Sequence, residues 1–142
     1  MSESRYHLIC LSILALLFAF RVIAQCVQNY FPLDHLPPFV AWQGSSLPYH
    51  WLLFFQIIIL LIMARQIFLV SREKIIQNRT LGKVLRVLGS LYFGSMFLRL
   101  AAGMTFAAEN HWFAAKLPSF FHLVLASFVL VLAHYHRTYS VK

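Results

Sequence analysis

Long apolar stretches follow one another along the chain, separated by segments that contain charged residues, proline and glycine. Each of the four stretches reaches the length of about 20 residues that a helix needs to cross a bilayer. The pattern predicts an all-α, polytopic membrane protein in which four transmembrane helices form one bundle. We expect these helices at about 6–27, 49–70, 84–108 and 118–136, within a single domain that covers residues 1–142.

The composition agrees with this class. Hydrophobic residues make up 61% of the chain and charged residues 11%, whereas soluble domains are about half apolar and a quarter charged. The net charge of +8 would suit nucleic acid, but the basic residues gather in one loop, which the positive-inside rule explains, so we expect no nucleic-acid partner. Cys10 and Cys26 lie about four helical turns apart, too far for a disulfide.

The distribution of basic residues predicts the orientation of the helices. The loop between the second and third stretches carries Arg72, Lys74, Arg79 and Lys83, whereas residues 28–48 contain no lysine or arginine. The positive-inside rule places the basic loop and both termini in the cytoplasm. The first stretch has the length of a signal peptide, but Arg21 and the lack of a clear cleavage site favour a retained anchor. Small size and short loops suggest a bacterial inner membrane.

Polar residues interrupt the apolar stretches in one half of the predicted bilayer. Arg99 lies about 20 Å of helix rise beyond Arg86, and a cation at such depth costs roughly 2.5–3.5 kcal/mol unless it finds a partner or water. The predicted orientation brings further polar side chains to the same half. The candidate ligand-binding residues are Arg21, Gln25, Gln56, Arg99 and His122.

Two interpretations of these residues stay open. In the first, the arginines line a polar pocket for an anionic or carbonyl group, because a guanidinium offers a planar fork of donors. In the second, Arg21 and Arg99 pair with Asp34 and Glu109, or extend to lipid headgroups. The sequence identifies no catalytic residue and no metal-binding spacing.

The two halves of the chain resemble each other. Residues 20–24 (FRVIA) and 97–101 (FLRLA) each precede an acid near a histidine, and a Leu-Pro pair then opens the next helix. A shift by two helices preserves topology, so a duplication would give a parallel two-helix repeat. Chance resemblance between apolar helices explains the same pattern.

Three classes of function fit these observations. The first is a non-enzymatic accessory, assembly or lipid-contacting subunit, whose partners are the bilayer and another membrane protein or a second copy of the chain. The second is a haem- or quinone-linked redox subunit that uses His122, Arg21 and Arg99 around a cofactor. A haem would need two facing histidines, and the positions of His122 and His50, or of His7 and His134, allow this. The third is a small transporter that functions as an oligomer. The cofactor is left unassigned.

Overall fold

The computed structural model describes residues 3–76, 78–106, 109 and 115–138, and every regular element in this part of the chain is an α-helix. Four helices are long and apolar enough to cross a membrane. They are α1 (Glu3–Tyr30), α3 (Tyr49–Ser71), α4 (Arg79–Met104) and α6 (Lys116–Thr138), and the short α2 (Phe39–Trp42) lies between α1 and α3. The predicted all-α membrane fold is confirmed.

The start and end of α4 differ from the prediction. The helix begins at Arg79 rather than near Val84, because the Asn78 side chain accepts hydrogen bonds from the backbone N–H groups of the next turn, at 2.9 and 3.1 Å. Such a cap satisfies donors that a helix start leaves unpaired, and it outweighs the polar character of the first turn. The helix ends at Met104 instead of continuing to 108, and residues 107–108 lie outside the described part.

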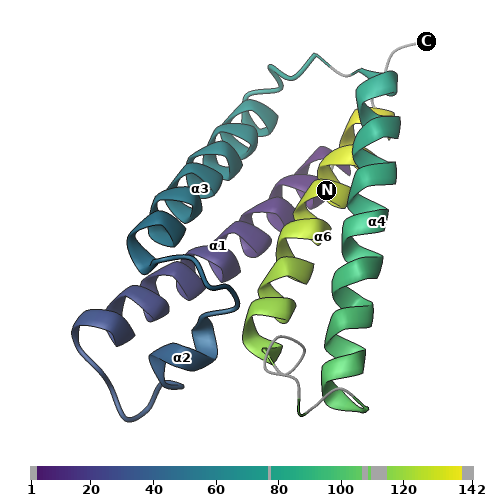
Figure 1. Cartoon of the computed structure of the whole chain (residues 1–142). Helices are drawn as coiled ribbons and strands as arrows, with labels where there is room; N and C mark the ends of the chain where they lie inside the picture. The colour runs from purple at the N-terminus through teal and green to yellow at the C-terminus, as the bar shows by residue number, and fades with distance from the viewer. Residues whose placement is uncertain (1–2, 77, 107–108, 110–114, 139–142) are drawn as a thin grey trace.

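The helices lie in the spatial order α3, α1, α6, α4 (Figure 1). Helix α6 packs against both α1 and α4, whereas α3 packs mainly against α1 and α4 mainly against α6. Accordingly, 39% of the apolar window of α6 is buried, against 11% for α4. The remaining faces of α3 and α4 are apolar and exposed, as expected of surfaces that contact lipid.

Helices α4 and α6 approach each other closely through glycine. A Cβ atom at Gly89 would lie 2.9 Å from the Leu130 side chain, and one at Gly82 would lie 3.2 Å from the backbone oxygen of Ala133. Small residues at such positions let transmembrane helices pack backbone to backbone. Gly94, on the same helix, has nothing within 4 Å of its Cβ position, so only part of the small-residue pattern serves this contact.

The bundle has two distinct ends. At the basic end, which carries the α3–α4 connection, the His7 and His134 rings stack and their nitrogens lie 2.7 Å apart. Nearby, His136 Nδ1 accepts a hydrogen bond from the Asn78 backbone at 3.3 Å. At the opposite end, here called the α2 end, α2 and its flanking loop fold against the start of α6.

The two helical hairpins do not pack symmetrically. Under a two-fold repeat, the contact between α1 and α6 would be matched by an equivalent contact between α4 and α3. The packing of α1 on α6 is extensive, but that of α3 on α4 is not. The repeat therefore stays a hypothesis about the sequence, without a matching symmetry in the helix contacts.

Candidate functional site

Arg21 is buried near the α2 end of α1, with 6% of its surface exposed. Its Nη2 donates a hydrogen bond of 3.2 Å to the carbonyl oxygen of Trp42, the last residue of α2. The guanidinium also lies over the Phe121 ring, 5.6 Å from its centroid, in a cation–π contact. Arg21 thus ties α1 to both α2 and α6, and its buried Nε has no hydrogen-bond partner among the described residues.

Trp42 fixes the loop that meets Arg21. Its indole N–H donates to the Pro37 carbonyl at 2.9 Å, and its ring stacks on Phe121 with centroids 6.1 Å apart. Only 2% of Trp42 is exposed. Because the ring is anchored on both sides, its carbonyl oxygen is held in place for Arg21.

Gln25 and Gln56 form a buried amide pair between α1 and α3. Gln56 Nε2 donates to Gln25 Oε1 at 3.0 Å, and the two residues are 3% and 0% exposed, respectively. Gln56 Oε1 and Gln25 Nε2 find no partner in the described part of the chain. Buried polar groups normally have partners, so this pair retains hydrogen-bonding capacity that the protein itself does not use.

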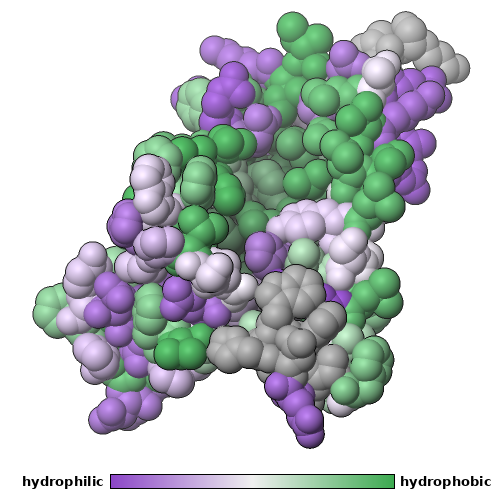
Figure 2. Space-filling view, in the orientation of Figure 1, coloured by the Kyte–Doolittle hydropathy of each residue, from purple (hydrophilic) through white to green (hydrophobic). Residues whose placement is uncertain are grey.

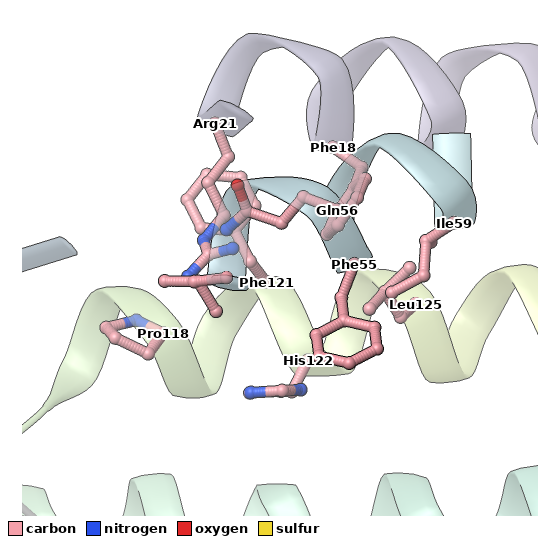
Figure 3. Close-up of a pocket in the computed structure, with 10 residues that line it drawn as sticks. Phe18, Arg21, Phe55, Gln56, Ile59, Pro118, Phe121, His122 and Leu125 are labelled. Atoms are coloured by element: carbon pink, nitrogen blue, oxygen red, sulfur yellow. The ribbon is translucent and has the colours of Figure 1, made fainter. Parts of the chain in front are cut away.

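Arg21 and Gln56 line the same small cavity, with a volume of about 90 Å³. Figure 3 shows Arg21 extending from α1 and Gln56 from α3 toward the region above Phe121. The remaining walls are mostly apolar or aromatic: Phe18, Leu52, Phe55, Ile59, Pro118, Phe121, His122 and Leu125. Two of the lining residues, Arg21 and Gln56, thus carry unpaired buried polar atoms beside mostly apolar walls, a combination that suits the polar end of an amphipathic molecule.

His122 is on the same cavity, but its ring is turned toward α4 (Figure 3). Its Nδ1 lies 2.5 Å from the hydroxyl of Tyr92, and the two rings meet edge to face. This hydrogen bond joins α6 to α4 and engages one of the two imidazole nitrogens. His122 therefore acts first as a helix-to-helix contact and only secondarily as a lining residue.

Arg99 lies at the same end of the bundle, on α4, and is 6% exposed. Gly44 brings the α2 loop close to it: a Cβ at Gly44 would lie 3.8 Å from Arg99 Nη2 and 2.5 Å from Cβ of Pro118. The two arginines predicted to share one half of the bilayer are thus both buried at the α2 end. Arg99 does not line the cavity that Arg21 and Gln56 share.

The two acids predicted to pair with the arginines are on the surface of the protein. Asp34 and Glu109 are both exposed. Arg21 donates to the Trp42 carbonyl instead of to Asp34, because the α2 loop folds its backbone over the arginine. Neither Arg21 nor Arg99 extends into solvent in the manner of a headgroup anchor, since each is 6% exposed.

An apolar groove continues from the polar cavity toward the basic end. It has a volume of about 380 Å³ and runs between α3 on one side and α6 and α4 on the other. Ile59 and Leu125 line both the cavity and the groove, so the two adjoin each other. Figure 2 shows this hollow with its apolar walls in green. The other lining residues are Ile62, Met63, Gln66, Leu81, Leu85, Phe128, Val129, Leu132 and His136.

The histidines considered as haem ligands make other contacts in the described part of the chain. His122 bonds to Tyr92, His50 is exposed against Trp51, and the direct contact between His7 and His134 leaves no space for an iron between them. Within the described ranges, no group of three or more His, Cys, Asp or Glu is placed to hold a metal ion. His111 lies outside the described residues.

Three contributors to the site were absent from the sequence-based prediction. Tyr92 precedes Arg99 by two helical turns and shares its face, so helical periodicity could have identified it. Phe121 follows the helix-opening Leu-Pro pair and looks like an ordinary lipid-facing aromatic. Trp42 acts through its backbone carbonyl, for which the sequence carries no signal.

Comparison of the chain with protein families, curated proteins and solved structures finds no match. The function must therefore be inferred from the residues of the site.

Proposed function

We propose that this integral membrane protein is a non-enzymatic, lipid-contacting component that holds one amphipathic molecule between α3 and α6. The observation that carries the proposal is that the two spaces lie side by side and share Ile59 and Leu125 as lining residues. A cavity lined by Arg21 and Gln56, which have unpaired buried atoms, adjoins a groove with mostly apolar walls. Ligand sites combine mostly apolar walls with a few placed polar groups. The polar end would lie at Arg21 and the apolar chain along the groove.

The proposed setting follows from the charge pattern. We place the protein in the inner membrane of a bacterium, with the basic end in the cytoplasm, because the basic residues cluster around the α3–α4 connection. The ligand's polar end then faces the outer leaflet. The exposed apolar faces of α3 and α4 are available to lipid, to another membrane protein or to a second copy of the chain.

The experiment fills the groove with a larger side chain. Ile59→Trp places an indole where the cavity and groove meet, whereas Val87→Trp makes a similar enlargement on α4 at a position that is 60% exposed. Native mass spectrometry of protein purified in mild detergent then detects the mass of the bound amphiphile. We expect wild type and Val87→Trp to retain one molecule and Ile59→Trp to lose it. Equal retention in all three proteins would contradict the proposal.

A quinone-linked redox subunit is the second candidate. The observation that favours it is the aromatic wall of the cavity, formed by Phe18, Phe55 and Phe121 beside the Arg21 donors. A quinone ring could stack there and accept a hydrogen bond through a carbonyl. Ultraviolet absorption of the solvent-extracted ligand, before and after borohydride reduction, separates the two candidates. A reducible quinone band supports the redox class, and its absence from a bound amphiphile supports the lipid-contacting class.

The oligomeric transporter receives less support. A solute path needs polar groups along the length of the bundle, but the unpaired buried polar atoms of the described residues lie toward the α2 end. The long groove that continues from them is apolar.

A further inference from the structure

Arg21 is a buried cation whose described contacts are all uncharged. It meets the Trp42 carbonyl and the Phe121 ring, while the nearest predicted acid, Asp34, is exposed. No carboxylate lines its cavity. Removing a charge from water is costly unless it is paired and hydrogen-bonded, so the site is electrostatically incomplete. A negatively charged ligand would supply the missing charge.

The unpaired hydrogen-bonding groups of Arg21 and Gln56 indicate which kind of head group the ligand has. Arg21 Nε–H is buried without an acceptor, and Arg21 lines a cavity of about 90 Å³, which admits only a compact head. The Gln25–Gln56 pair adapts to such a head: if both amides rotate by 180°, their mutual hydrogen bond is kept and Gln56 carries an unpaired N–H in place of its unpaired oxygen. Arg21 and Gln56 then both donate. Two donors converging on one compact anion fit a carboxylate.

The groove indicates what is attached to the head. The groove has a volume of about 380 Å³ and adjoins the cavity at Ile59 and Leu125, and its walls are mostly apolar along the middle of the bundle. A second apolar hollow, of about 600 Å³ between α1 and α3, is lined only by apolar residues and Ser12 and has no buried cation. Only the first hollow therefore offers both a charged end and a hydrocarbon path.

We propose that the occupant of the cavity and groove is a single-chain fatty acid, with its carboxylate on Arg21 and Gln56 and its alkyl chain between α3 and α6. This inference rests on the proposed function and specifies its ligand class. The site recognises the head by charge and donors, and it recognises the chain by apolar contact. A fatty alcohol of equal length lacks the charge and an alkyl phosphate has a bulkier head, so each tests one part of the inference.

The test compares oleate, oleyl alcohol and oleyl phosphate as competitors against a fluorescent fatty acid, with the full chain in phosphatidylcholine nanodiscs. We expect oleate to bind about tenfold or more tightly than the alcohol, because both hydrogen-bond to the charged Arg21 but only the carboxylate adds the attraction of an opposite charge. We also expect it to bind more tightly than the phosphate. Arg21→Gln should abolish the preference of wild type for oleate over the alcohol. Arg86→Gln, the same exchange at an exposed position on α4, should keep it.

Other results of the competition experiment would contradict different parts of the fatty-acid assignment. Equal binding of oleate and oleyl alcohol by wild type would overturn the charge recognition, while binding of an amphiphile in the groove would stand. Tighter binding of the phosphate would overturn the carboxylate assignment. If no amphiphile competes, both this inference and the proposed function fail. If Arg21→Gln does not fold, Gln56→Leu provides the second variant, and an unchanged oleate preference in it would remove Gln56 from the head site.

Discussion

The two helical hairpins of this protein hold together by different means. Helices α4 and α6 meet through glycines, with Gly82 and Gly89 so close to α6 that a single added carbon would collide with it. Helices α1 and α3 instead share the buried Gln25–Gln56 hydrogen bond, and α3 has little other support in the bundle. In a membrane, close van der Waals packing drives helix association. The α4–α6 hairpin is therefore the most closely packed part of the bundle, and α3 depends mainly on its contact with α1.

This difference places the groove where the structure can open. One wall is α6, which packs on both α1 and α4, and the other is α3, which packs mainly on α1. A small displacement of α3 widens the groove without disturbing the glycine contacts. An amphiphile that bridges α3 and α6 would in turn supply contacts that α3 otherwise lacks.

The largest expected loss of unfolding free energy comes from disrupting the contact between α4 and α6. Gly89→Leu forces a side chain into the contact with Leu130, where even a Cβ would lie at 2.9 Å. Overpacking of this kind costs about 1–3 kcal/mol. Reversible unfolding in mixed micelles should show this loss of unfolding free energy.

Gly94→Leu is the matched control, because nothing lies within 4 Å of the Gly94 Cβ position. We expect its unfolding free energy to change by no more than about 0.5 kcal/mol, as for substitutions that meet no neighbouring group. Equal losses in the two variants would show that the glycine contacts do not distinguish the hairpins.

A smaller loss of unfolding free energy is expected when the hydrogen bond between α1 and α3 is removed. Gln25→Leu removes the only described hydrogen-bond partner of the Gln56 amide and should cost about 1 kcal/mol. A double-mutant cycle with Gln56→Leu should give a coupling of about 0.6 kcal/mol, the size typical of hydrogen bonds between transmembrane helices. Spin-label distances from α3 to α1 should broaden while those from α4 to α6 stay narrow. Broadening of both distances would contradict the separate roles of the hairpins.

The smallest change in unfolding free energy is expected from Tyr92→Phe. It deletes the hydroxyl that meets His122 but keeps the ring and the glycine contacts of the same hairpin. The loss of unfolding free energy should be about 0.6 kcal/mol or less. A loss as large as that of Gly89→Leu would mean that polar contacts, rather than close packing, hold α4 on α6.

The fold could be predicted because helix length and hydropathy are local properties of the sequence. Four apolar runs gave four helices, and α3 was placed within one residue at each end. The start of α4 was missed because a single cap, Asn78, extends the helix through polar residues. Hydropathy alone does not register such a cap.

The site could be predicted only in part. Of the candidate residues, the structure brings Arg21, Gln56 and His122 to one cavity, joins Gln25 to Gln56, and leaves Arg99 off that cavity, while their function stays a prediction. Which groups touch depends on helix rotation and loop path. The Trp42 carbonyl on Arg21 arises from the fold of the α2 loop, and the Tyr92 hydroxyl on His122 arises from the way α4 turns against α6. Neither follows from composition or spacing.

The most direct measurement is the position of a bound fatty acid. The probe is a fatty acid with a photoreactive diazirine near the end of its chain, crosslinked in nanodiscs and mapped by peptide mass spectrometry. We expect labels on groove residues such as Met63 and Phe128, and their loss in Arg21→Gln but not in Arg86→Gln. Labels confined to the hollow between α1 and α3, around Ala15 and Leu61, would contradict a binding site between α3 and α6.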